Sequence, residues 1–141
     1  MVKMVKLITG GKGTGKSKRM IAMANELIKT GKGHVVFIND DKRPMYDLKY
    51  EMRFVSMDEY PINDPKGFHG FLCGMISSDH DIEAIFVDGL PNIIKVNDKT
   101  PVDFLKEINM LSQKFEIDFI TSLNCVESDI PEELKDYITV L

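Results

Sequence analysis

Two stretches of the chain, residues 35–38 and 84–87, are apolar at every position. A strand with one face in water alternates apolar and polar residues, whereas an unbroken apolar run is typical of a strand covered on both faces. Helices are the elements that cover both faces of a parallel sheet. These runs therefore predict an α/β fold, in which a parallel sheet lies between two layers of helices.

Segments with helical spacing alternate with the strand-like runs. Apolar residues recur every three or four positions over 16–30, over 65–77 and after Pro101, as on one face of a helix. The alternation of the two patterns is that of a parallel sheet with crossover helices. The expected strands are Val5–Thr9, His34–Asn39, 54–57, 84–87, Asp118–Leu123 and the final run 137–141, with a short helix after Pro131.

Two of these helices carry more detailed expectations. Thr100 and Asp103 have capping-box spacing, and Pro101 would be the first helical residue, so the third long helix should begin there. Gly67, Gly70 and Gly74 lie on the side opposite the apolar residues of 65–77. Each glycine costs roughly 1 kcal/mol of helix propensity. Either a neighbour packs closely against them, or this segment is loosely formed.

Composition limits the class of protein. The chain has 141 residues, of which 43% are hydrophobic and 28% charged, which is typical of one globular domain over residues 1–141. No apolar targeting segment opens it, and no stretch approaches the ~20 apolar residues of a membrane span. We therefore expect a cytoplasmic protein without a membrane partner. The net charge of −4 argues against nucleic acid as its main partner.

A glycine-rich loop joins the first expected strand to the first expected helix. It reads Gly10-Gly11-Lys12-Gly13-Thr14-Gly15-Lys16-Ser17 and matches the pattern G-x-x-x-x-G-K-[ST] at every fixed position. The glycines allow the backbone to fold around a phosphate, with N–H groups pointing inward and the positive end of the helix behind them. In such a loop the lysine reaches the β- and γ-phosphates, and the serine hydroxyl binds Mg²⁺.

Asp88 ends the apolar run 84–87 and precedes Gly89. An aspartate before a glycine often opens a simple turn. A carboxylate at a strand end can also hold the Mg²⁺ that a phosphate loop uses, in the arrangement called Walker B. With the loop present, the second interpretation is favoured, and the predicted metal ligands are Ser17 and Asp88.

These residues resemble those of P-loop NTPases, and the resemblance covers nearly the whole chain as a bare core. Asp40 and Asp41, after the strand His34–Asn39, are similar to the acidic position of RecA-like ATPases, which polarises the attacking water. Ser122 and Asn124 resemble their later polar sensor of the γ-phosphate. The resemblance implies a base at Asp40 or Asp41 and a nucleotide contact at Ser122 or Asn124, although polar residues also commonly begin loops.

In detail the chain looks like small stand-alone bacterial ATP-binding proteins that are often labelled twitching-motility (PilT-type) ATPases. It is far too short for a complete secretion motor, so the motility role is not carried over.

The segment Asp88-Gly89-Leu90-Pro91-Asn92 is similar to the D-G-x-P-R signature of adenylate kinases, with Asn92 in place of the arginine. Nucleotide kinases clamp phosphates with several arginines, because the guanidinium fork bonds oxygens in pairs. This chain has three arginines and none after position 53. A nucleoside or nucleotide kinase-like phosphotransferase is therefore the alternative. The guanine motif of GTPases and the four-cysteine zinc site of thymidine-kinase-like enzymes are missing.

Two functions remain open. The first is a slow Mg²⁺-dependent ATPase, in which Lys16 and Mg²⁺ supply positive charge and Asp40 or Asp41 activates the water. An arginine finger is worth ~10³ to 10⁵ in rate, and a protein partner or second subunit would supply it unless Arg19, Arg43 or Arg53 does. The second is a module that binds and senses ATP. ATP is assumed because guanine signals are missing, since the loop itself reads phosphates and not the base.

Overall fold

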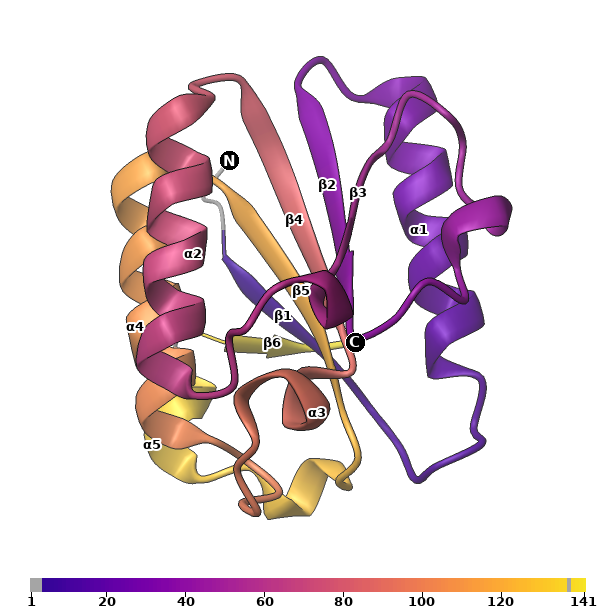
Figure 1. Ribbon diagram of the computed structural model, residues 1–141. Coiled ribbons are helices and arrows are strands. Elements are labelled where there is room, and N and C mark those ends of the chain that lie inside the picture. Colours follow the sequence, from indigo (N-terminus) through magenta and orange to yellow (C-terminus); the bar gives the residue numbers. More distant parts are fainter. Residues whose placement is uncertain (1–3, 137) are drawn as a thin grey trace.

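The computed structural model describes residues 4–136 and 138–141. Within these ranges the chain forms one sheet of six parallel strands with helices on both sides (Figure 1). The strands are β1 (Val5–Thr9), β2 (His34–Asn39), β3 (Arg53–Ser56), β4 (Ile82–Asp88), β5 (Asp118–Leu123) and β6 (Ile138–Val140). The helices are α1 (Lys16–Thr30), α2 (Pro65–Ser78), α3 (Leu90–Ile94), α4 (Val102–Phe115) and α5 (Glu132–Lys135).

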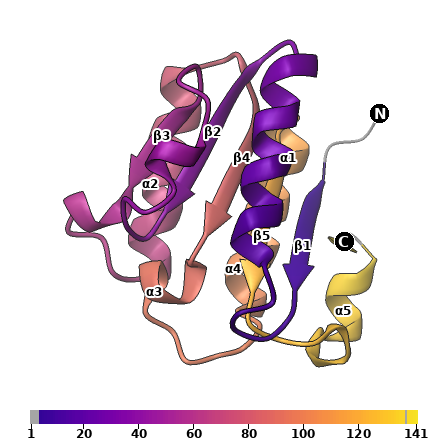
Figure 2. The ribbon, with the colours of Figure 1, turned by 90° about the vertical axis from the view of Figure 1, so that its right-hand side faces the viewer.

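Each face of the sheet is covered by its own helices (Figures 1 and 2). Helix α1 covers one face, where its buried Met20 packs in a cluster with Phe37 and Phe86, whose stacked rings have centroids 5.8 Å apart. Helices α2 and α4 lie on the other face, and Phe68 of α2 stacks on Phe104 of α4 at 5.8 Å. The predicted three-layer α/β fold is confirmed, because the unbroken apolar strands β2 and β4 are buried on both faces.

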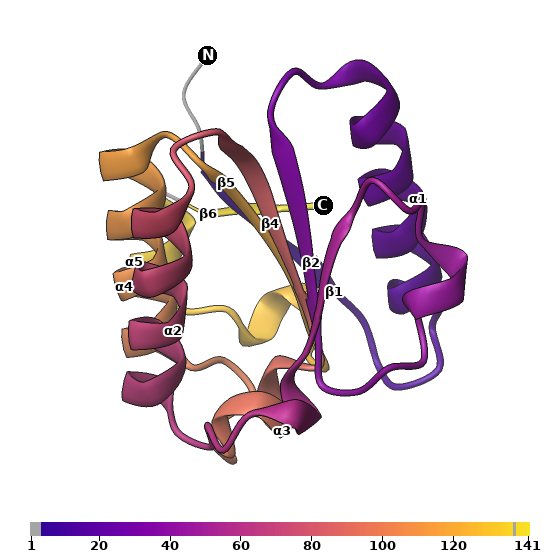
Figure 3. The same ribbon diagram turned by 45° about the horizontal axis from the view of Figure 1, so that its top comes forward.

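The strand order β3-β2-β4-β5-β1-β6 places β5 between the two strands that carry the expected motifs, β1 and β4. All six strands run the same way, so their carboxyl ends share one edge of the sheet (Figure 3). In register, Asn39 pairs with Asp88, and Val87 pairs with Thr121. Ligands of open α/β sheets bind outside this edge. The topology therefore brings the ends of β1, β2, β4 and β5 to one place.

The start of α4 differs from the prediction. The helix begins at Val102, Pro101 is its N-cap, and no side chain caps it. The Thr100 hydroxyl instead donates to the carbonyl of Asp129 at 3.4 Å. The predicted capping box is therefore wrong, because Thr100 is used in a contact with the segment before α5.

The glycines of α2 have no close neighbour at two of the three positions. A Cβ added at Gly70 or Gly74 would meet nothing within 4 Å, and both residues are exposed. Gly67 lies beneath the helix cap, where its N–H donates to Asp64 Oδ1 at 2.7 Å. Close packing by a neighbour therefore does not explain Gly70 and Gly74.

Three smaller differences concern short elements. Strand β3 begins at Arg53, and Met57 belongs to a 3₁₀ turn instead of the strand. Helix α3 was not expected, although Pro91 is tolerated in a first helical turn. Of the predicted final strand, Tyr137 lies outside the described residues, as do residues 1–3 at the other end of the chain. Within the described ranges, no helix combines the length and apolar character that crossing a bilayer requires.

Candidate functional site

The glycine loop between β1 and α1 adopts a backbone that other residues rarely tolerate. Gly10, Gly13 and Gly15 have φ values of 146°, 81° and 84°. Gly15 is the N-cap of α1, no side chain caps the helix, and its first turn contains no acidic residue. The N–H groups and the positive dipole end of α1 are therefore not neutralised by a capping carboxylate, which suits them to an anion.

Lys16 lies over the loop that precedes it. Its Nζ donates to the carbonyl of Gly10 at 2.9 Å and to that of Gly11 at 2.7 Å. The Thr14 hydroxyl also donates to the Gly11 carbonyl, at 2.7 Å. The N–H of Gly10 donates to the carbonyl of Cys125, so the segment after β5 supports the start of the loop. The two lysine bonds hold the ammonium group against the start of the glycine loop.

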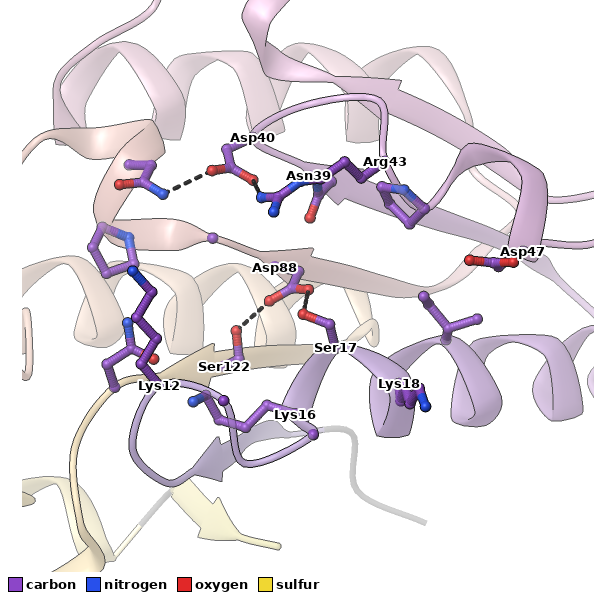
Figure 4. A pocket seen from close by; sticks show the side chains of 18 residues that line it. Lys12, Lys16, Ser17, Lys18, Asn39, Asp40, Arg43, Asp47, Asp88 and Ser122 are labelled. Atoms are coloured by element: carbon purple, nitrogen blue, oxygen red, sulfur yellow. Dashed lines mark hydrogen bonds and ion pairs between the residues drawn. The ribbon is translucent and has the colours of Figure 1, made fainter.

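The carboxylate of Asp88 lies between two serine hydroxyls (Figure 4). Ser17 Oγ donates to Asp88 Oδ2 at 2.6 Å, and Ser122 Oγ donates to Asp88 Oδ1 at 2.6 Å. Asp88 is only 7% exposed. A buried carboxylate is costly unless it is hydrogen-bonded, and here each oxygen has a donor. The two predicted metal ligands thus meet, and Ser122 fixes the second carboxylate oxygen.

The two candidate bases at the end of β2 point to different surroundings. Asp40 lines the pocket, and its Oδ2 accepts a hydrogen bond from Asn92 Nδ2 of α3 at 2.7 Å. Asp41 does not line the pocket and accepts from Nε of Arg43 at 2.7 Å. The hydrogen bond from Arg43 lowers the pKa of Asp41 below its usual range. Asp40 is therefore the one of the pair placed to contact a bound molecule.

These groups surround one open pocket of about 650 Å³ at the carboxyl edge of the sheet (Figure 4). Basic and acidic side chains are both present in its lining, so the field inside is mixed and not simply positive. It is lined by Lys12, Gly13, Gly15, Lys16, Ser17, Lys18, Ile21, Asn39, Asp40, Arg43, Pro44, Asp47, Asp88, Gly89, Pro91, Asn92, Ser122 and Asn124.

Most of the site residues expected from the sequence lie at this pocket. The loop residues Gly10, Gly11 and Thr14 contribute by shaping the loop and do not line it, and Asp41 lies outside. The sequence named Arg43 only as one of three arginines that could act as a finger, and Asn92 only as the residue in place of a kinase arginine; neither was predicted to line the site. Arg43 belongs to an irregular polar stretch without a motif, and Asn92 belongs to the unexpected helix α3. No local pattern distinguished Arg43 from the other two arginines or placed Asn92 beside Asp40.

Comparisons with known proteins bear on the fold. No family model and no curated protein sequence matches the chain. Among solved structures, the chain is similar to the flagellar accessory protein FlaH from Methanocaldococcus jannaschii, with 16% sequence identity and a TM-score of 0.54. The match covers 94% of this chain and 65% of that one, so the chain spans about two thirds of the length of FlaH.

At this identity the likeness concerns the fold alone. It agrees with the parallel sheet and its two helical layers, and it supports the RecA-like architecture expected from the sequence. It gives no support to the twitching-motility resemblance. The chain has a three-layer α/β fold of RecA-like type, with its candidate site at the carboxyl edge of the sheet.

Proposed function

We propose that this protein binds a nucleoside triphosphate, with ATP as the default, together with Mg²⁺, and hydrolyses it slowly. The observation that carries the proposal is the pair of hydrogen bonds on Asp88. Ser17 follows the glycine loop, and Asp88 ends a strand 71 positions later, yet Ser17 Oγ and Asp88 Oδ2 are 2.6 Å apart. That convergence was expected from the sequence for a Mg²⁺-dependent phosphate site, and a glycine loop that only capped a helix would not require it.

The donor set fits Mg²⁺. A hydroxyl and a carboxylate are hard oxygen ligands, which this ion prefers, alongside phosphate oxygens and water. Ser17 and Asp88 would hold it, and Ser122 would orient the carboxylate. When bound, the ion neutralises charge on the β- and γ-phosphates. Lys16, above the loop, would bind the same phosphates.

Hydrolysis needs a group that orients water on the far side of the γ-phosphate from its leaving oxygen. Asp40 lies on the β2 side of the pocket, across Asp88 from Lys16 (Figure 4). In the proposed reaction the water oxygen bonds to the γ-phosphorus, and the bond to the β–γ bridging oxygen breaks. ADP leaves, and the water proton passes to Asp40 or to solvent.

The test is calorimetric titration of the protein with ATP, with and without Mg²⁺. We expect Mg²⁺ to strengthen binding and Lys16→Ala to weaken it at least about tenfold, because an ammonium–phosphate contact exceeds 1.4 kcal/mol. Lys29→Ala is the matched control, since Lys29 is an exposed lysine in the last turn of the same helix. Absence of binding at millimolar ATP, or equal binding by the Lys16 variant, contradicts the proposal.

One observation keeps phosphotransfer as a second candidate. The pocket lining also includes Ile21 of α1 and, after β2, Pro44 and Asp47, and its volume of about 650 Å³ gives room for an acceptor in place of water. A kinase would form ADP without releasing phosphate when the acceptor is present. Parallel assays of ADP and phosphate, with nucleosides and nucleoside monophosphates added, separate the two: equal yields of both products favour hydrolysis.

A further inference from the structure

The three arginines of the chain occupy different places. Arg53 at the start of β3 forms an ion pair with Asp79, at the end of α2. Arg19 lies in α1 with its side chain exposed and outside the pocket lining. Arg43 is the one arginine among the pocket-lining residues of the described chain. Figure 4 shows it on the β2 side of the pocket, beside Asp40.

Arg43 is held by its neighbour Asp41 at two points. Its backbone N–H donates to Asp41 Oδ1 at 3.0 Å, and its Nε donates to Asp41 Oδ2 at 2.7 Å. Asp41 Oδ1 also accepts from Nδ2 of Asn39 at 3.0 Å, and Asn39 is buried at the end of β2. A short series of hydrogen bonds thus connects the guanidinium of Arg43 to the rigid sheet.

The guanidinium of Arg43 lies near Asp40, and both residues line the pocket. Nε is used by Asp41, whereas Nη2 lies 4.0 Å from Asp40 Oδ1, which is an ion-pair separation beyond hydrogen-bond reach. The Nη groups therefore keep donors for another anion. A guanidinium fork bonds two oxygens at once, which matches the equatorial oxygens of a phosphoryl group in transfer.

We propose that Arg43 stabilises the charge on the γ-phosphate from within the same chain, and that Asp41 positions it. The inference rests on the proposed nucleotide hydrolysis, to which it adds one residue that stabilises charge, Arg43, and one that positions it, Asp41. It gives Asp41 a role other than base, and it removes the need for an arginine from a partner. Arg43 acts while the γ-phosphorus exchanges its bond to the bridging oxygen for one to water; it forms no bond and moves no proton.

Phosphate release and nucleotide trapping test this on the purified chain. The variants are Arg43→Ala, Arg43→Lys and Asp41→Asn, and Arg19→Ala is the control that removes an equal charge outside the pocket. Each is titrated with MgATP, assayed for kcat and KM, and incubated with MgADP and aluminium fluoride, which mimics the phosphoryl group in transfer. Retention of ADP after gel filtration reports the trapped state.

We expect Arg43→Ala to lower kcat at least about 100-fold and to abolish trapping, while MgATP affinity changes less than about threefold. The kcat of Arg43→Lys should lie between those of the wild type and Arg43→Ala, because lysine keeps the charge but loses the guanidinium fork. Asp41→Asn should lower kcat about tenfold at unchanged affinity, and should have no further effect in the Arg43→Ala background, since the two act as one unit. Unchanged MgATP binding shows that the variants are folded.

Several results would overturn the inference. Turnover of Arg43→Ala at the wild-type rate, or an equal loss in Arg19→Ala, removes the role of Arg43. Additive effects of Asp41→Asn and Arg43→Ala remove the positioning role of Asp41. A wild-type protein that binds MgATP but neither hydrolyses nor traps it overturns the inference and leaves nucleotide binding standing. A wild-type protein that does not bind MgATP overturns both proposals.

Discussion

The side-chain amide of Asn92 donates a 2.7 Å hydrogen bond to the carboxylate of Asp40, which connects α3 to the residue after β2, and both side chains line the pocket. Gly89, just before α3, also lies against Asp40, because a Cβ added at Gly89 would lie 2.7 Å from Asp40 Cγ. Asp40 is thus oriented by a helix that begins two residues after Asp88. A change at the end of β4, where we propose that Mg²⁺ binds, can reach the proposed water-orienting group through this short connection.

Asn92→Ala removes the amide that orients Asp40. We expect kcat for phosphate release to fall about tenfold, a part of the 10²–10⁴ that a positioned base contributes, with MgATP affinity within about twofold. Steady-state phosphate release and calorimetry measure the two effects. An unchanged kcat would mean that Asp40 needs no support from α3.

Asp40→Asn separates hydrolysis from simple binding. If Asp40 orients the water, this nearly isosteric change should lower kcat about 10²- to 10⁴-fold while MgATP still binds. The structure also distinguishes Asp40 from its neighbour, because only Asp40 lines the pocket. A variant that hydrolyses ATP at the wild-type rate would mean that Asp40 is not the group that orients the water.

Much of the fold could be predicted because it depends on burial. The apolar runs at 35–38 and 84–87 became the central strands β2 and β4, and the helical spacing over 16–30 became α1. What could not be predicted depends on tertiary contacts. Thr100 has the sequence of a helix cap, yet it bonds to Asp129, which lies 29 positions away. Local propensity cannot anticipate that competition.

In the site, too, some features could be predicted from the sequence and others depend on tertiary contacts. Ser17 and Asp88 were predicted as a pair of metal ligands, and Ser122 or Asn124 was implied by the resemblance; in the structure, Ser17 and Ser122 each bond to Asp88 at 2.6 Å. The choice between Asp40 and Asp41 could not be made from the sequence. The structure separates the two positions by an Asx-type loop, in which Asp41 bonds to the backbone and side chain of Arg43, and that loop has no distinctive sequence pattern.

Gly74→Ala should stabilise the protein. Gly74 is exposed to solvent and lies within α2, away from both helix ends. An added Cβ would meet open space, so alanine reduces the entropy of the unfolded chain at no steric cost. We expect a gain of about 0.5–1 kcal/mol in the free energy of unfolding, measured in urea. Gly89→Ala is the contrast and should destabilise, because φ is +77° and the new Cβ would contact Asp40. A loss of stability in Gly74→Ala would indicate a contact of α2 that the structure does not contain.

The ionisation of Asp79 makes the free energy of unfolding depend on pH in the acid range. The hydrogen bond from His34, at 2.7 Å, lowers the pKa of Asp79, and the charge of Arg53 acts in the same direction. A carboxylate whose pKa is lower in the folded chain stabilises it above the ordinary value of 3.8, and this contribution is lost as the pH falls through the folded value. We expect Asp79→Asn to cost about 1 kcal/mol at pH 7 and progressively less below pH ~4 in urea unfolding. A difference that stays constant down to pH ~2 would contradict this account.

The two cysteines should react at very different rates. Burial raises the pKa of the Cys125 thiol, which is 4% exposed, whereas Cys73 on α2 is half-buried. Since the thiolate is the reactive form, we expect a disulfide reagent at pH ~8 to modify Cys73 at least about tenfold faster than Cys125. Cys73→Ser should remove the fast phase, and Cys125→Ser should leave it intact.

Because the Cys125 carbonyl accepts the N–H of Gly10 in the glycine loop, saturating MgATP should slow the Cys125 phase further and leave the Cys73 rate unchanged. Equal rates for both thiols in the native protein would mean that the segment after β5 opens far more often than its packing implies.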